Sequence, residues 1–447
     1  MSLMTRVTAP PARTEAAELA LALLAAPPSA PASLHLQRTV LGGPGVVGLG
    51  VVGLGSAGLG SAGLGAGRPV VGRPRGLGTS ALHPIPRPAA PSDAAGRGIP
   101  GSGGSATLGA PPDHAAGAAR GRSGAVPELY CPPALRDDPA LGGLVNERLI
   151  AWAAEIGLFA DKLDHIRAAD FGRFIMLAHP ESDDPDRLLA AAKCALAEWA
   201  TDDVYCDGDD AQPELLGARL GLAYTAVDPP WIGSARQPVL DEALREDPVR
   251  VALRSGFKHV AQYAAPGQLN RLRLEVAALF NGYNTEGSWR QCKYIPPVWQ
   301  YLAERQQNNF MPTICLVDVV GGYHLSATEY GAPPVRRAVL MAALAATLVN
   351  DLYSMSKEQR GADYDYNLPT LIAVEERCSP GEAVRRAAAL HDELVHTYER
   401  EAAALAAAGS PMLARYLVGV WAWMGGNHEW HRSTTHYATA RDKESNR

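Results

Sequence analysis

Two short stretches of the sequence carry oxygen-bearing side chains at spacings that suit a metal site. In the first, DDVYCD, Asp202 and Asp203 continue an apolar helical stripe that includes Trp199. Two carboxylates at the end of a core-facing stripe are costly unless a cation neutralises them. Mg²⁺, which takes oxygen ligands, would do so, with Asp207 as a further acid. The alternative is a solvated acidic helix end, since such Asp-rich patterns are common by chance.

The second stretch is NDLYSMSKE, in which Asn350, Ser354 and Glu358 follow one another at steps of four. Residues four apart share one face of a helix. The preceding turns are apolar nearly all round, which predicts a buried helix whose polar stripe faces the interior or a cavity mouth. An exposed last turn would explain the same residues. Considered with the acidic stretch, these oxygens favour a Mg²⁺ cluster.

Three cationic residues complete the set of candidates. Arg305 lies 45 residues before Asn350, and Lys357 and Arg432 are further candidates. Carboxylates that bind metal, together with guanidinium and ammonium groups, suit a diphosphate ligand. Each cation taken singly is better explained as a surface charge.

The elements that must position these residues begin after a long arm. Residues 1–126 contain no Phe, Trp, Tyr or Lys, yet hold 24 of the 45 glycines and 15 of the 35 prolines. They include the repeat VVGLGVVGLGSAGLGSAGLG. Such a composition offers too little apolar surface to offset the entropy of ordering. We therefore predict a disordered Pro/Gly/Ala-rich arm over 1–126 and one folded domain over 127–447.

The pattern of the folded part predicts an all-α bundle, because strand-type alternation is almost absent. Capping residues and prolines predict several helix boundaries. The expected starts are Asp184-Pro185, Pro333-Pro334 for a buried helix over Val335 to about Glu358, Ser379-Pro380 for a helix to about Ala408, and Pro411.

Charge and cysteine usage exclude several classes of function. Residues 127–447 carry 31 basic against 43 acidic side chains, which argues against nucleic-acid binding. The six cysteines form no CxxC pair and no zinc spacing, so a reducing compartment, the cytoplasm, is expected. No apolar run is long enough to predict a membrane span.

These motifs resemble those of the bacterial class I terpene synthases, in which an Asp-rich motif precedes N-D-x-x-S-x-x-x-E on a later helix. Longer stretches are similar to the 2-methylisoborneol synthase group within that family. They are PPVWQYLAERQQNNF (296–310), VGGYHLS (320–326), NLPTLIA (367–373) and GNHEWHR (426–432). The resemblance covers about Leu129 to Tyr437, and long N-terminal arms are also common in that group.

The resemblance implies the class I terpenoid synthase bundle and a set of site residues. The implied ligands of three Mg²⁺ ions are Asp202, Asp203, Asp207, Asn350, Ser354 and Glu358. The implied diphosphate contacts are Arg305, Lys357, Arg432 and Tyr437, and the implied catalytic residues are Asp202, Arg305 and Tyr437. One departure is that His436 precedes Tyr437 where the family has Arg. Either His436 or Arg432 would then take that role.

The implied reaction converts 2-methylgeranyl diphosphate and water to 2-methylisoborneol and diphosphate. It implies a functional link to a methyltransferase that makes the substrate, and it allows a homodimer. The cavity must be apolar and lined with aromatic faces that stabilise a carbocation. The aromatic residues available for it are Trp199, Phe310, Tyr353 and Trp423, although an aromatic residue in a helical stripe is more often an ordinary core residue.

Four alternatives stay open at the level of sequence. Proton loss from the same cation would give 2-methylenebornane, and a sesquiterpene cyclase would act on farnesyl diphosphate. An isoprenyl chain-elongating synthase would need a second Asp-rich motif, which residues 350–358 do not supply. A helical interaction protein leaves the Asn/Ser/Glu register unexplained.

Overall fold

The computed structural model describes residues 126–207, 211–358 and 366–434, with the side chains of 356–358 left aside. Every regular element in these ranges is helical, which confirms the all-α prediction. The predicted arm lies outside the described residues except for Val126. The elements are α2 (Pro139–Glu155), α3 (Leu163–Ala169), α4 (Phe171–Ala178), α5 (Pro185–Tyr205), the 3₁₀ helix η1 (Pro213–Leu215), α6 (Leu216–Val227), α7 (Gln237–Arg245), α8 (Pro248–Val260), α9 (Pro266–Cys292), α10 (Val298–Glu304), α11 (Met311–Ile314), α12 (Val317–Val320), α13 (Ala327–Tyr330), α14 (Pro333–Glu358), α15 (Leu368–Glu375), α16 (Pro380–Ala408) and α17 (Pro411–Ser433).

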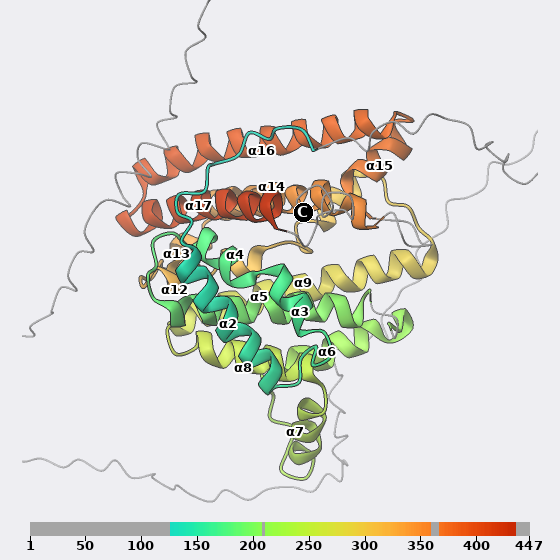
Figure 1. Cartoon of the computed structure of the whole chain (residues 1–447), viewed down its shortest axis with the longest axis vertical. Coiled ribbons are helices and arrows are strands. Elements are labelled where there is room, and N and C mark those ends of the chain that lie inside the picture. Colours follow the sequence, from blue (N-terminus) through green and yellow to red (C-terminus); the bar gives the residue numbers. More distant parts are fainter. Residues whose placement is uncertain (1–125, 208–210, 359–365, 435–447) are drawn as a thin grey trace, which may run out of the picture. The chain divides into compact units, whose positions relative to one another are not determined.

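Helix α5 begins where its capping residues predict. The Asp184 side chain accepts hydrogen bonds from the backbone N–H groups of Asp186 and Arg187, and Pro185 occupies the first turn. Its apolar stripe is buried against α2, α4 and α8. In Figure 1, α5 crosses the middle of the bundle, whereas α7 projects from its lower side. The stripe therefore fixes the direction in which the acidic end of α5 points.

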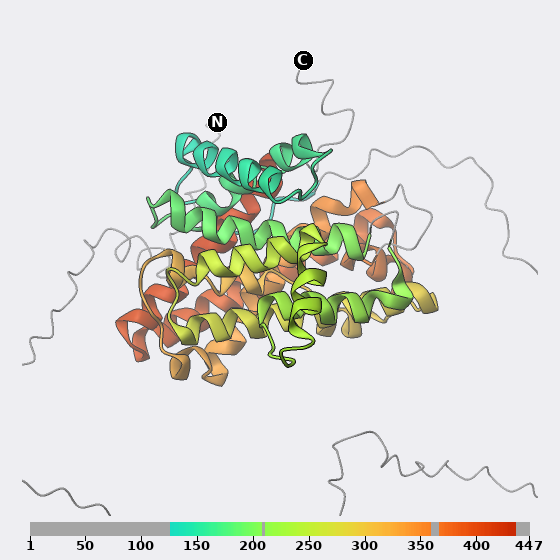
Figure 2. The same ribbon diagram turned by 90° about the horizontal axis from the view of Figure 1, so that it is seen from below.

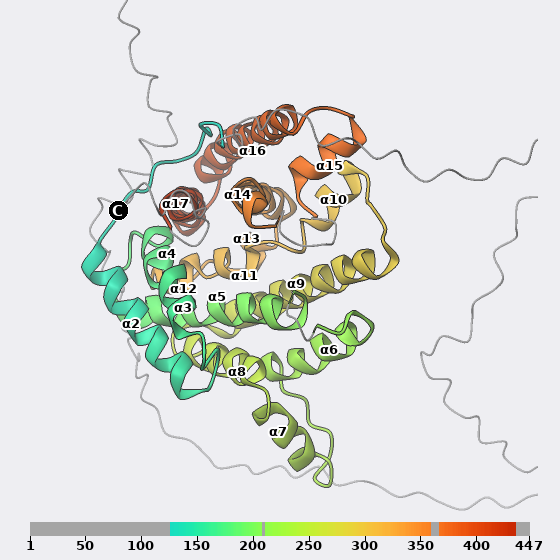
Figure 3. The same ribbon diagram turned by 45° about the vertical axis from the view of Figure 1, so that its right-hand side comes forward.

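Helix α14 is the buried central helix that its apolar sequence predicts. Its side chains from Ala342 to Val349 are buried, and it packs against α15, α16 and α17. Figure 3 shows α14 nearly end-on among these helices. Among the described helices, only α14 is long and apolar enough to span a membrane, over Pro333–Met355, but 72% of that window is buried in the protein. This is the burial of a core helix.

The last two long helices also begin at predicted positions. The Ser379 hydroxyl accepts from the Glu382 backbone N–H at the start of α16, and that helix ends at Ala408 as expected. Ser410 caps α17 in the same way, ahead of Pro411. Figure 2 shows the long helices running in roughly the same direction, as in a bundle. Their ends therefore gather residues that are far apart in the sequence.

Candidate active site

The acidic end of α5 faces the C-terminal end of α9. Asp202 and Asp203 are half-buried and Asp207 is exposed. Arg290 of α9 donates to Asp207 Oδ1 at 2.6 Å and to Glu286 Oε1 at 2.6 Å. Burial, followed by repulsion from Asp207 and Glu286, raises the pKa of Asp202 well above the usual carboxyl value. This end of the bundle thus holds more acid than its arginine neutralises, and a cation would relieve the excess.

A chain of hydrogen bonds connects this acidic end to α14. Glu286 Oε2 accepts from Asn308 Nδ2 at 3.0 Å. The Asn308 carbonyl accepts from Arg305 Nη1 at 3.2 Å, and Arg305 Nη2 donates to Asp351 Oδ1 at 2.5 Å. Asp351 lies directly after Asn350. The structure therefore links Arg305 with both predicted metal-binding stretches.

Arg305 is a buried cation, and its hydrogen bonds fix the orientation of the guanidinium plane. Its side chain is 13% exposed and that of Asp351 only 1%. Arg305 Nε also donates to the Tyr301 hydroxyl at 2.8 Å, and Tyr301 donates to Asp351 Oδ2 at 2.7 Å. Among the described residues these bonds use three of the five N–H groups of the guanidinium, so two remain for an anion.

On α14, Asn350 and Ser354 meet α17 rather than solvent. Asn350 Nδ2 lies 3.2 Å from His431 Nε2. His431 Nδ1 lies 2.9 Å from the Asn427 carbonyl, which can only accept, so Nδ1 carries the proton. With the proton on Nδ1, Nε2 is the acceptor for Asn350 Nδ2, and the Asn350 oxygen is turned away from the ring. The Ser354 hydroxyl is buried and has no hydrogen-bond partner among the described residues.

These donors fit Mg²⁺ by type. Carboxylate, amide and hydroxyl oxygens are the ligands that hard divalent cations take, and the unpaired Ser354 oxygen is a buried atom that a ligand would satisfy. Within the part of the chain that the structure describes, no three His, Cys, Asp or Glu side chains already converge as a metal site.

The remaining predicted residues fall into two groups. The side chains of Lys357 and Glu358 lie outside the described residues, as do His436 and Tyr437 entirely. Arg432 is described: its side chain is 60% exposed and pairs with Glu429 at 2.8 Å. Its charge also acts on Tyr353 of α14, so the role of Arg432 at the site stays a prediction.

Aromatic rings gather beside His431. Phe310 lies 5.5 Å from Trp423 and 6.3 Å from Phe174 between ring centroids, and its edge contacts His431 at 6.1 Å. Tyr353 also lies 6.1 Å from His431. Trp199 instead stacks 5.3 Å from His165, toward α3. Of the four predicted aromatic residues, Phe310, Trp423 and Tyr353 therefore adjoin the site, and Trp199 packs elsewhere.

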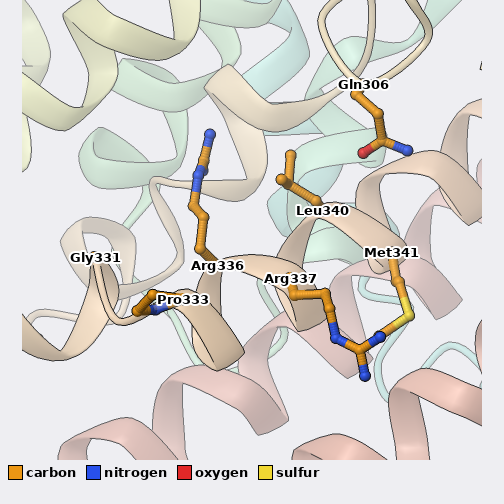
Figure 4. A pocket seen from close by; sticks show the side chains of 7 residues that line it. All are labelled: Gln306, Gly331, Pro333, Arg336, Arg337, Leu340 and Met341. Atoms are coloured by element: carbon orange, nitrogen blue, oxygen red, sulfur yellow. The ribbon is translucent and has the colours of Figure 1, made fainter. Parts of the chain in front are cut away.

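A groove lies at the other end of α14. Figure 4 shows its lining, with Arg336 and Arg337 pointing away from each other. Arg336 pairs with Glu275, and Arg337 pairs with Glu401. Both guanidinium groups are thus already bonded. The groove contains none of the predicted site residues, and we do not assign the chemistry to it.

Four residues of the site escape the sequence analysis. Glu286 and Arg290 read as an ordinary exposed pair at i, i+4 on a helix. Asp351 follows Asn350 inside the recognised motif but carries no predicted role. His431 lies in the GNHEWHR stretch, where only Arg432 is predicted to act. The one available signal is that Asp351 and His431 belong to stretches that already carry the resemblance.

Comparisons with known proteins identify similar chains. A family model described as terpene synthase family 2, C-terminal metal binding, matches residues 193–397. A 2-methylisoborneol synthase from Streptomyces ambofaciens is 39% identical over 366 residues, which cover 81% of this chain and 79% of that protein. One from Saccharopolyspora erythraea is 37% identical over 334 residues, 72% of this chain and 94% of that protein.

A solved structure is also similar. It is the 2-methylisoborneol synthase from Streptomyces coelicolor A3(2) in complex with Mg²⁺ and 2-fluoroneryl diphosphate, with a TM-score of 0.68 and 38% identity. The match covers 70% of this chain and 98% of that one. Both metal-binding stretches predicted from the sequence, at 202–207 and 350–358, fall within the family match.

Proposed function

Because this chain belongs to the 2-methylisoborneol synthase group of the class I terpene synthases, we propose that it converts 2-methylgeranyl diphosphate and water to 2-methylisoborneol and diphosphate. The enzyme would then be a Mg²⁺-dependent lyase that acts on a diphosphate. The observation that carries the proposal is the hydrogen-bonded chain from Asp207 through Arg290, Glu286 and Arg305 to Asp351. It joins the acidic motif, a buried cation and the Asn350 helix at one end of the bundle.

The residues at this end would bind the diphosphate. Asp202, with Asp203 or Asp207, would hold two Mg²⁺ ions, and Asn350, Ser354 and Glu358 a third. Bound Mg²⁺ supplies the positive charge that stabilises the departing diphosphate. Arg305, fixed by Asp351 and Tyr301, directs its remaining N–H groups toward the same anion. Lys357 and Tyr437 are proposed as further contacts, with His436 or Arg432 in the place of the usual Arg.

The hydrocarbon part of the substrate would lie among apolar and aromatic side chains. Ionisation breaks the C–O bond and leaves an allyl cation and diphosphate. Recapture and rotation about C2–C3 permit closure to a 2-methyl-α-terpinyl cation and then to a 2-methylbornyl cation, which water quenches. Phe310, Trp423 and Tyr353 present ring faces that can stabilise these cations without reacting. Trp423 is fully buried and packs against the partly buried Phe310, which also helps to exclude stray water.

Incubation of the purified chain with Mg²⁺ and each of three diphosphates tests the proposal, with products identified by gas chromatography and mass spectrometry. We expect 2-methylgeranyl diphosphate to exceed geranyl diphosphate in kcat/KM by about 10- to 100-fold, because one methyl group in an apolar cavity is worth about 1–3 kcal/mol at most. Farnesyl diphosphate should be poor, because its four extra carbons overfill a cavity shaped for a C11 cation.

The same experiment separates the alternatives. Farnesyl diphosphate as the best substrate would replace the proposal with a sesquiterpene cyclase. A product that is entirely 2-methylenebornane would indicate proton loss instead of water capture. No product from any of the three would favour a helical interaction protein.

The proposal also covers the source of the substrate, the location of the enzyme and its domain organisation. The substrate carries one methyl group more than geranyl diphosphate, so a methyltransferase must supply it, and we place both enzymes in the cytoplasm. Residues 127–447 would form the catalytic domain and 1–126 a disordered arm. A homodimer would be compatible with this assignment, and sedimentation analysis of the purified chain tests for it.

A further inference from the structure

Glu198 is a buried acid on α5 that the reaction described above does not yet use. It lies four residues before Asp202, hence on the same face of α5 and about 6 Å further along the helix axis, away from its acidic end. Glu198 is only 8% exposed. Its Oε1 is shielded from solvent and has no hydrogen-bond partner among the described residues. Buried polar atoms are nearly always paired, so this one calls for an explanation.

The neighbours of Glu198 place it next to the end of the site that would bind the diphosphate. The Tyr283 hydroxyl of α9 donates to the Glu198 backbone carbonyl at 3.3 Å. The Glu198 charge also contributes to raising the pKa of the thiols of Cys194 and Cys315. Its carboxyl group therefore lies near α5, Tyr283 of α9 and Cys315, the residue that follows α11. Asp202 is also on α5, Glu286 is also on α9, and Phe310 directly precedes α11.

Another buried acid provides a contrast. Glu399 is also 8% exposed, but its Oε2 accepts from the Tyr130 hydroxyl at 2.8 Å and its Oε1 from Trp421 Nε1 at 2.9 Å. A carboxyl group that only stabilises the fold is expected to be satisfied in this way. Glu198 has the same burial without such bonds. Glu198 therefore has hydrogen-bonding capacity that one water molecule would satisfy, and the reaction requires a water.

The protonation state of Glu198 suits a site that handles carbocations. Burial raises the pKa of Glu198 well above the usual carboxyl value and so favours the neutral form over the carboxylate. A neutral carboxyl group both donates and accepts hydrogen bonds, so it can hold one water molecule in a fixed orientation. A carboxylate at the same place would itself be a nucleophile toward the cation.

We infer that Glu198 holds the water molecule that captures the final cation, and thereby decides between alcohol and olefin as the product. This inference rests on the proposed function. In the capture step a lone pair of the water oxygen forms a C–O bond to the cationic carbon. One O–H bond of that water then breaks, and the proton passes to the diphosphate released at ionisation. Glu198 stays neutral throughout and serves as a catalytic residue by orienting the reacting water.

Two substitutions and a matched control test this role with 2-methylgeranyl diphosphate. Glu198→Met keeps the side-chain volume but cannot bind water, whereas Glu198→Gln keeps a donor and an acceptor. We expect the ratio of 2-methylisoborneol to 2-methylenebornane to fall by about tenfold or more in the Met variant and to stay near the wild-type ratio in the Gln variant. The melting temperature of the Met variant should hold or rise, because an unpaired buried acid is removed.

The control is Glu399→Gln, which should lower the melting temperature and leave the product ratio unchanged. An unchanged ratio in Glu198→Met, or an equal loss of alcohol in Glu198→Gln, would overturn the inference. So would a marked fall in the melting temperature of Glu198→Met, which would reveal a structural partner. If the wild type makes no 2-methylisoborneol, the proposed function itself has failed. If wild type and Glu198→Met make the same alcohol, only the role of Glu198 has failed.

Discussion

The two ends of helices α9 and α14 differ in how far their acidic side chains are paired with arginines. At the N-terminal end, Glu275 of α9 pairs with Arg336 of α14 at 2.6 Å and also accepts from the Tyr330 hydroxyl at 3.1 Å. One turn earlier, Arg271 pairs with the fully buried Asp318. Acids and arginines are matched one to one here. We call this the balanced end.

At the C-terminal end the acids outnumber their partners. Asp202, Asp207 and Glu286 lie near Arg290, the one arginine in the described residues that bonds to any of them. The hydroxyl of Ser354 is buried without a partner among the described residues. We call this the acidic end. Charges that support a fold are neutralised within the protein, whereas an uncompensated excess marks the place where a ligand completes the structure.

The largest expected effect is the loss of turnover at the acidic end. Asp202→Asn and Glu358→Gln should each lower kcat by about 100-fold or more, because each removes a charged ligand while keeping its shape. Without Mg²⁺ both variants should melt close to the wild type. Steady-state assays and thermal melts measure both quantities. Full activity in both variants would refute the metal cluster.

The matched substitution at the balanced end should lower the stability of the protein and leave its turnover nearly unchanged. Glu275→Gln leaves Arg336 without its ion-pair partner, and we expect the free energy of unfolding to fall by about 3 kcal/mol. Turnover at a temperature where the variant is folded should change little. Urea unfolding and a kinetic assay on the same preparation test this. A large loss of kcat with normal stability would mean that the two ends are not separate in function.

An intermediate effect is expected from His431, which contacts Asn350. His431→Phe removes the acceptor for Asn350 Nδ2, so the amide loses this restraint on its orientation. We expect the Mg²⁺ concentration for half-maximal binding of a non-hydrolysable diphosphate analogue to rise about tenfold, as for other residues that orient metal ligands. Calorimetry measures this without turnover, and His431→Gln, which retains an acceptor, is the control. Unchanged Mg²⁺ dependence in the Phe variant would rule out the orienting role.

A smaller effect should follow from removal of the internal cation at the acidic end. Arg290→Gln leaves Asp207 and Glu286 without their guanidinium, so without Mg²⁺ the melting temperature should drop by a few degrees, about 1 kcal/mol for a pair that is partly exposed. Added Mg²⁺ should restore more stability to this variant than to the wild type. Equal shifts with Mg²⁺ in both proteins would show that Arg290 and the metal do not share these acids.

The smallest effect is expected from the N-terminal arm. Deletion of residues 1–120 should leave the melting temperature and turnover nearly unchanged, because a segment without aromatic residues contributes little to a core. Scanning calorimetry and kinetics of the truncated chain measure both. A loss of several degrees would mean that the arm contributes to the stability of the helical domain.

The sequence alone determined the helical class, the main helix starts and the shared face of Asn350 and Ser354. These features depend on residues a few positions apart: Asp184 caps its own helix, and the apolar run of α14 requires burial whatever its neighbours are. The nature of the chemistry also followed, since oxygen ligands at helical spacing indicate a metal with little reference to the rest of the chain.

Only the tertiary structure decided which charges meet and which remain unpaired. Arg305 and Asp351 are 46 residues apart, and Asn350 and His431 are 81 apart, so no local spacing predicts either contact. Glu198 reads in the sequence as one acid on a helix, and its missing partner is visible only once α9 and α11 enclose it. Burial and hydrogen-bond satisfaction depend on the surrounding helices, and for this reason the sequence alone did not show which acids are matched by an arginine and which are not.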